Sequence, residues 1–175
     1  SPRPDKPAVA GEVPHLKNAD TVGLAHALLA ALDFQPRRNA AVQVFSPSEN
    51  GFNLSVNADL LVEGNGRAVM FRTKTLPAQF VAGLRKKNIS FTQLTDGAGK
   101  TGVVTQVLKG MGIAYTTGLF SLPLPPGARP GQITLHLTGL KIGEGERILY
   151  LTEADIDPGL YDWLTAQGGI RIFRF

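Results

Sequence analysis

Two stretches of this chain, residues 52–94 and 133–175, follow the same order of strand-forming, turn and helix-forming residues, and this repeat constrains the fold most strongly. When the stretches are aligned, the turn Glu63-Gly64 lies opposite Glu144-Gly145. Agreement of turns, helix signals and hydrophobic periodicity between two different sequences indicates one common structure. We therefore predict an α/β fold, with α+β as the alternative, made of two ββαβ units. We interpret them as an internal duplication; convergence on a common ββαβ pattern is the alternative.

The individual elements follow from hydrophobic periodicity and from turn residues. Alternation of apolar and polar residues is typical of a half-buried strand, whereas apolar residues three or four apart are typical of a helix. These patterns predict helices over 21–32, from near Pro77 and after Asp157-Pro158, and strands over 41–45, 52–58, 68–71, 89–94, 133–142, 147–151 and 170–175.

Between the two repeats, residues 95–131 predict a helix followed by a loop. Val103, Val104 and Val107 belong to a helical apolar stripe, and residues 113–120 have an extended pattern. The segment 121–131 reads SLPLPPGARPG and contains four prolines. Irregular exposed loops often carry binding residues. We nevertheless interpret this segment as a rigid connector between the two halves.

Several side chains are expected to stabilise helix ends or the core. Asp20 and Thr75 stand just before predicted helices, where their side chains suit the N-cap position. The acidic cluster 153–157 also precedes a helix, and the helix dipole favours negative charge there. We expect capping rather than metal binding from this cluster. Trp163 lies on the predicted apolar face of the last helix, so we expect it in the core.

Composition and the ends of the sequence suggest its organisation. Residues 1–14 contain four prolines and predict a flexible linker, which leaves 15–175 as one globular domain. No apolar run reaches the roughly 18 residues that a transmembrane helix needs, so we expect none. The chain has no cysteine and begins at Ser1 rather than Met. We expect an exported, periplasmic or extracellular protein, with a cytoplasmic location as the alternative.

The formal net charge of +4 permits an anionic partner. The basic residues are scattered, however, and only Arg37-Arg38 and the run 85–87 are adjacent. Positive charge in the last turn of a helix complements the helix dipole, which explains the second group. We therefore expect no nucleic-acid partner.

The turn at residues 96–101, DGAGKT, follows a predicted strand and opens a helix, which is the setting of a phosphate-binding loop. Gly97, Gly99, Lys100 and Thr101 are the candidate anion-binding residues. The Walker pattern requires a further glycine at the position of Leu94, because the loop backbone must wrap the phosphates. We predict a weak anion site here and no bound nucleotide cofactor.

The order helix, three strands, helix, strand over 21–94 resembles the core of the restriction-endonuclease-like nucleases. In that family an Asp precedes a Glu-x-Lys motif on the next strand. Asp59 and Lys74 occupy the places of the Asp and the Lys, but Arg72 stands at the place of the Glu. Nuclease activity needs paired carboxylates for Mg²⁺, and an arginine repels the metal. The resemblance therefore implies a degenerate relative rather than an active nuclease.

The remaining chemistry is sparse. His15, His26 and His136 lack the spacing of metal ligands, and no nucleophile-elbow motif is present. We predict no catalytic or metal-binding residue. Our leading hypothesis is a non-enzymatic binding or assembly module of a larger, exported cell-envelope protein, whose partner is a protein or another envelope component. The alternative is a nucleotide- or phosphate-binding protein or a degenerate restriction-endonuclease-like nuclease.

Overall fold

The computed structural model describes residues 12–46, 52–64, 67–73, 75–166 and 169–175. The chain divides into two compact units. The central unit comprises residues 18–113, and the terminal unit combines the segment up to residue 17 with residues 114–175. Each unit contains its own four-stranded sheet, so the two sheets are separate. The single globular domain expected over 15–175 stays a prediction.

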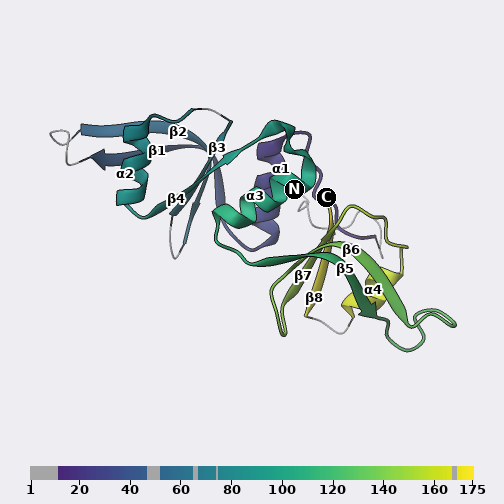
Figure 1. Ribbon diagram of the computed structural model, residues 1–175. Coiled ribbons are helices and arrows are strands. Elements are labelled where there is room, and N and C mark those ends of the chain that lie inside the picture. Colours follow the sequence, from purple (N-terminus) through teal and green to yellow (C-terminus); the bar gives the residue numbers. More distant parts are fainter. Residues whose placement is uncertain (1–11, 47–51, 65–66, 74, 167–168) are drawn as a thin grey trace. The chain divides into compact units, whose positions relative to one another are not determined.

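The central unit begins with a helix and three antiparallel strands, followed by a second helix and a parallel strand (Figure 1). The strands lie in the order β1-β2-β3-β4. A short 3₁₀ turn, η2, and a third helix complete the unit. The elements are α1 (Thr21–Ala31), β1 (Pro36–Ser46), β2 (Phe52–Glu63), β3 (Arg67–Arg72), α2 (Ala78–Lys86), β4 (Ile89–Leu94), η2 (Asp96–Ala98) and α3 (Gly99–Gly110).

The core of the central unit follows from the two periodicities of its sequence. On α2, Phe80 and Leu84 are buried one turn apart, and they pack against alternate residues of the sheet, including Val44 and Val69. Gly83 lets α2 approach closely, because a Cβ atom there would overlap the side chain of Val44. Helices α1 and α3 pack against each other, α1 also contacts β1 and β2, and α3 also contacts β4.

The terminal unit repeats this strand topology. Its sheet has the order β5-β6-β7-β8, in which β5, β6 and β7 are antiparallel neighbours and β8 runs parallel to β7 after a helix. Leu160 and Leu164 of that helix pack on one face of the sheet against Tyr150 and Ile172. The elements are β5 (Tyr115–Pro123), β6 (Thr134–Ile142), β7 (Ile148–Thr152), α4 (Leu160–Thr165) and β8 (Ile170–Arg174).

The predicted pair of similar units is confirmed, and the similarity extends beyond the repeated stretches. In both halves the ββαβ segment is preceded by one antiparallel strand, β1 or β5, and before that by a helix, α1 or α3. Along the chain the order α-βββ-α-β therefore occurs twice, although α3 packs within the central unit. A common origin of the halves stays a prediction.

The proline-rich segment 121–131 lies between the two repeated stretches, as predicted, but within the terminal unit. Its first residues complete β5, and the rest forms the loop between β5 and β6. The Leu124 amide donates to the Ile133 carbonyl at 2.9 Å and closes this loop. Prolines fit here because the loop needs few backbone donors.

The predicted linker boundary at residue 14 was placed too late. Val13 is 5% exposed and belongs to the core of the terminal unit. The Arg174 amide donates to the Pro14 carbonyl, and the Leu16 amide donates to the Arg174 carbonyl. These bonds run along the open side of β8. Residues 1–11 of the predicted linker lie outside the described residues.

Three expectations for single side chains were also wrong. Trp163 is 41% exposed, because only Leu160 and Leu164 of the short helix α4 reach the core. Thr75 does not cap α2, whose N-cap is Pro77 without a side-chain hydrogen bond. The acidic cluster 153–157 forms ion pairs instead of a cap: Asp155 with Arg174, at 2.8 Å, and Asp157 with Arg129. The predicted cap Asp20 is confirmed, since its carboxylate accepts from the Gly23 amide.

Candidate functional site

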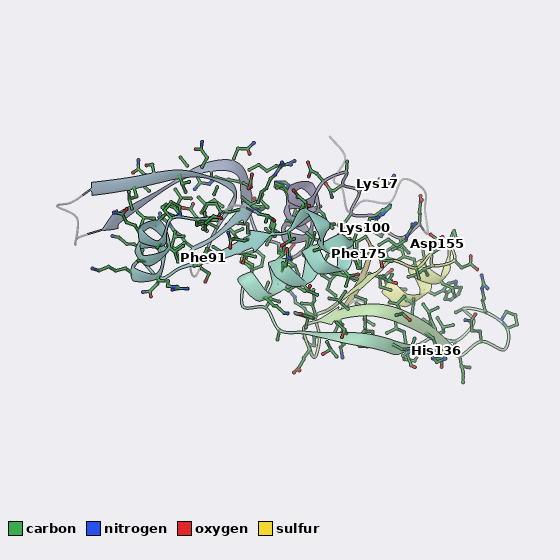
Figure 2. All side chains as sticks on the ribbon, turned by 45° about the horizontal axis from the view of Figure 1, so that its top comes forward. Lys17, Phe91, Lys100, His136, Asp155 and Phe175 are labelled. Atoms are coloured by element: carbon green, nitrogen blue, oxygen red, sulfur yellow. The ribbon has the colours of Figure 1, made fainter. Side chains whose placement is uncertain are left out.

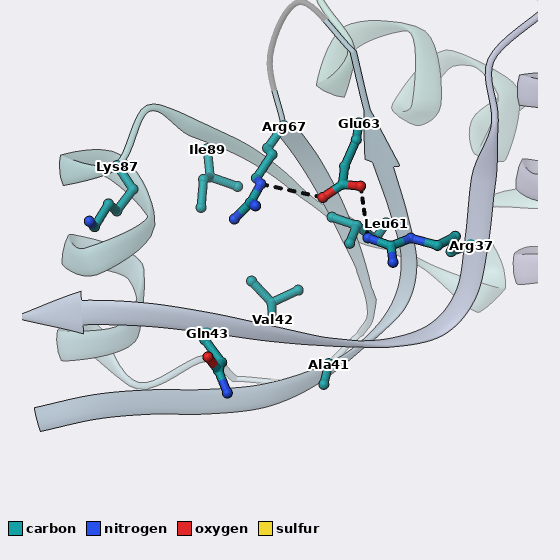
Figure 3. A pocket seen from close by; sticks show the side chains of 9 residues that line it. All are labelled: Arg37, Ala41, Val42, Gln43, Leu61, Glu63, Arg67, Lys87 and Ile89. Carbon is teal, nitrogen blue, oxygen red and sulfur yellow. Dashed lines mark hydrogen bonds and ion pairs between the residues drawn. The ribbon is translucent and has the colours of Figure 1, made fainter.

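An open cavity of about 470 Å³ lies in the central unit, on strands that the sequence separates widely (Figure 3). All four strands of the sheet and the end of α2 contribute to it. This volume is within the usual range of small-ligand pockets. The lining residues are Arg37, Ala41, Val42 and Gln43 of β1, Leu61 and Glu63 of β2, Arg67 of β3, Lys87 after α2, and Ile89 of β4.

The apolar part of the cavity is formed by core residues. Val42, Leu61 and Ile89 are 3%, 4% and 5% exposed, and all three belong to the core cluster beneath α2. They meet because β1 pairs with β2, β2 with β3 and β3 with β4. Little of these three side chains is still exposed, so a ligand gains chiefly by covering the aliphatic stems of the arginines and the lysine that line the cavity beside them.

The charged part of the cavity is formed by two arginines that share one carboxylate. The Arg37 guanidinium donates to Glu63 at 2.8 Å, and Arg67 lies 3.5 Å from the other oxygen of the same carboxylate. Figure 3 shows Glu63 between the two arginines. The side chain of Arg37 is 61% exposed, that of Glu63 is 45% exposed and that of Arg67 is 53% exposed. Ion pairs this exposed are weak, so a competing anion can displace Glu63 at little cost.

The formal net positive charge of the chain comes from the central unit. Residues 18–113 contain ten basic and six acidic residues, whereas the remaining residues contain eight of each. The formal net charge of +4 therefore belongs to the central unit alone. The rim itself carries Arg37, Arg67 and Lys87 against one acid, Glu63. The cavity is thus an amphipathic site with an excess of positive charge.

The predicted anion-binding turn lies at a second cavity, of about 430 Å³, also in the central unit. Gly99 and Lys100 line it at the start of α3, together with Arg72 and the start of α1; Gly97 and Thr101 do not line it. Lys100 is labelled in Figure 2. Asp20 and Asp96 line the same cavity, so its two cations are matched by two acids. This balance of charge makes it the weaker candidate of the two for binding an anion.

Asp59 and Arg72, which occupy the places of the Asp and the Glu in the nuclease motif, form an ion pair. Asp59 accepts from the Arg72 amide at 2.5 Å, and its other oxygen lies 3.6 Å from the Arg72 side chain. Arg72 thus contacts both oxygens of the Asp59 carboxylate, which a bound metal ion would need as a ligand. Lys74 lies outside the described residues. Within the described part of the chain, no three His, Asp or Glu side chains come close enough to hold a metal ion.

The three histidines lie on different elements. His15 pairs with β8, His26 lies on α1 of the central unit, and His136, which is labelled in Figure 2, lies on β6. Burial lowers the pKa of His26, and the nearby Arg38 guanidinium lowers it further. His136 Nδ1 lies 3.2 Å from Ser121 Oγ on the neighbouring strand. Both side chains are exposed, and no carboxylate is found with this pair among the described contacts, so we assign it no catalytic role.

Comparison with known proteins returns no matching family model, no similar curated protein and no similar solved structure. Within the described residues, no helix has the length and hydrophobicity that a membrane span requires. Function must therefore be argued from the site itself.

Reasoning from the sequence missed the residues of the larger cavity. Arg37 and Glu63 are far apart in the chain and meet only through the register in which Arg37 pairs with Leu61. One local signal was available. Glu63 is the first residue of the predicted turn and Arg67 follows the turn, and a hairpin brings such residues together, as the pairing of Glu63 with Arg67 shows.

Proposed function

We propose that this chain is a non-enzymatic binding module whose central unit takes a ligand with an anionic group joined to an apolar body. The observation that carries the proposal is the cavity in which Arg37 and Arg67 face one carboxylate above an apolar floor. Arginines bind carboxylates and phosphates with charge-assisted hydrogen bonds. The apolar floor supplies the remaining binding energy.

Glu63 has a defined part in this proposal. Its carboxylate occupies the place between the arginines that an incoming carboxylate or phosphate would take. The side chain keeps both arginines extended over the cavity in the free protein. On binding, the ligand anion replaces it and Glu63 turns to solvent, where nearly half of its surface already lies.

The wider context belongs to the same proposal. We place the module in a larger, exported cell-envelope protein, and its partner is a protein or another component of the envelope. Support comes from the absence of cysteine and from the proline-rich first residues. Fractionation of the native organism, followed by immunoblotting, tests the compartment independently of ligand binding.

Three probes test the chemistry of the cavity. Octyl phosphate has both the anion and the apolar chain, inorganic phosphate has only the anion, and octyl glucoside has only the chain. In calorimetric titrations we expect octyl phosphate to bind tenfold or more tightly than either partial probe, since about 1.4 kcal/mol from the second part suffices. Equal binding of octyl glucoside, or no binding of octyl phosphate, contradicts the proposal.

Matched variants assign the binding to this cavity. The double substitution Arg37→Gln with Arg67→Gln should weaken octyl phosphate binding about tenfold, because hydrogen bonds to charged groups contribute about 1.5–3 kcal/mol. Glu63→Gln should strengthen binding, since it removes the competing charge. Arg38→Gln is the control: Arg38 lies on the same strand but pairs with Asp20 outside the cavity. It should bind like the unmodified chain.

A second candidate function is phosphate binding at the smaller cavity. It is favoured by one observation, the meeting of Lys100, Gly99 and Arg72 beside the start of α1. Helix N-termini favour anions. Lys100→Ala should abolish phosphate binding if this site is the main one, and should leave it unchanged if the larger cavity is.

A further inference from the structure

The two edges of the sheet in the terminal unit are treated differently. On the β8 side, residues 14–16 run alongside the strand and exchange backbone hydrogen bonds with Arg174. On the other side, β5 is the last strand of the sheet and pairs only with β6 among the described strands. Every residue from Tyr115 to Pro123 has a partner in β6, so the pairing is continuous, although Gly118 has a positive φ of 146°. The outer side of β5 therefore presents a row of backbone donors and acceptors.

Strand β5 lacks most of the features that protect exposed sheet edges; the positive φ of Gly118 is the one local irregularity among its described residues. Such edges are normally short, charged, kinked or interrupted by proline. Strand β1, which is the corresponding edge strand of the central unit, has these features at its start. They are Pro36, Arg37 and Arg38, followed by Asn39 with a φ of 53°. By contrast, the sequence of β5, YTTGLFSLP, contains no charge, and its one proline is the last residue.

Leu119 marks the middle of this unprotected edge. It is the central residue of the nine in β5, and it is 65% exposed. Exposed large apolar side chains are found at only three positions in the described chain, and Leu119 is the one that lies within a strand. An exposed apolar side chain on an open edge is typical of a surface that pairs with another strand.

We propose that two copies of this chain associate through β5, which pairs antiparallel with β5 of the second copy about a two-fold axis at Leu119. The two four-stranded sheets then become one continuous sheet. Identical strands meet in such an isologous contact, so each side chain must tolerate its symmetry mate. The uncharged sequence of β5 meets this condition.

The register centred on Leu119 gives favourable pairs along the strand. Leu119 faces Leu119 of the second copy, and Thr117 faces Ser121, a pair that can form a hydrogen bond. On the other face, Gly118 lies opposite Phe120; the Phe120 ring packs on Tyr150 of its own unit, and the small glycine opposite leaves room for it. Shifting the register removes this set of pairs.

Electrostatics permits this association. The terminal unit contains as many acidic as basic residues, whereas the central unit carries the whole net charge of +4. A contact through the terminal unit therefore brings together two surfaces without net charge repulsion. One strand pair buries less area than most stable dimer interfaces. The dimer should accordingly be concentration-dependent.

Because the sequence contains no cysteine, a single introduced cysteine can test the proposed strand pairing by cross-linking. Leu119→Cys introduces a single thiol, and on the proposed axis it faces its own copy at about 4.5–5.5 Å between Cβ atoms. Oxidation, or a short bismaleimide linker, should convert this variant to a covalent dimer. Ile133→Cys is the matched control, because Ile133 is 79% exposed but lies outside the strands. Equal cross-linking of the two variants contradicts the proposal.

Sedimentation of the full chain tests association without cross-linking. We expect the unmodified chain to pass from monomer to dimer as its concentration rises. Leu119→Lys should weaken dimerisation about tenfold, because like charges directly opposite one another destabilise a strand pair, and Ile133→Lys should not. A circular dichroism spectrum like that of the unmodified chain verifies that Leu119→Lys is folded. A chain that stays monomeric at all concentrations, or a dimer unaffected by Leu119→Lys, overturns the proposal.

Discussion

Replacement of Gly139 by alanine is expected to destabilise the terminal unit by about 3 kcal/mol or more, at the upper end of the usual cost of overpacking. Gly139 lies on β6, and a Cβ atom there would overlap the carbonyl oxygen of Leu151 on β7. A flexible side chain could move aside, but this oxygen belongs to the backbone beside the pair Leu140–Leu151. Relief of the overlap therefore requires β6 and β7 to separate.

Urea denaturation measures this effect through the only tryptophan of the chain, Trp163, which lies on α4 of the same unit. Glu144→Ala is the control, because Glu144 is exposed in the turn that follows β6 of the same unit. The control should change the free energy of unfolding by no more than about 0.5 kcal/mol, as surface substitutions do. A Gly139→Ala protein as stable as the control would show that β6 and β7 are spaced differently.

Leu84→Ala is expected to produce the largest loss of stability in the central unit. Leu84 is 0% exposed and holds α2 on the sheet beside Phe80. Truncation of a buried leucine removes its transfer free energy and leaves a cavity, at a cost of about 2–5 kcal/mol. The floor of the ligand cavity belongs to the same core, so octyl phosphate binding should weaken as well.

The matched control for this substitution is Gln79→Ala, on the exposed side of the same helix. It should leave both stability and binding nearly unchanged. Denaturation followed by far-ultraviolet circular dichroism gives the comparison. A loss below about 1 kcal/mol for Leu84→Ala, which is an average single-mutation effect, contradicts the packing of α2 described above.

The sequence predicted the elements well where the determining signals are local. Glu63 of the predicted turn ends β2, Gly64 follows it, and residues 144–145 follow β6. The helix predicted from near Pro77 is α2, on which Phe80 and Leu84 are buried one turn apart. These features depend on residues within one or two turns of each other, and the repeat supplied each signal twice.

The predictions for Trp163 and for the linker were wrong, and the cavity was missed, because these features depend on tertiary packing. Trp163 fits a helical stripe, but α4 has only six residues and buries two leucines without it. Val13 looks like part of a proline-rich linker, yet it reaches the core because β8 offers backbone partners to residues 14–16. The cavity of the central unit depends on the pairing of four strands, and no local pattern in the sequence encodes the meeting of Arg37 with Glu63.

Amide chemical-shift mapping with octyl phosphate tests the central claim most directly, because it locates the ligand without any substitution. We predict that the perturbed amides cluster around Arg37, Leu61, Glu63, Arg67 and Ile89, the cavity of the central unit. Inorganic phosphate should perturb the arginine side of this cluster more weakly. Shifts confined to residues 96–101 at the start of α3, or spread evenly over both units, would contradict the account.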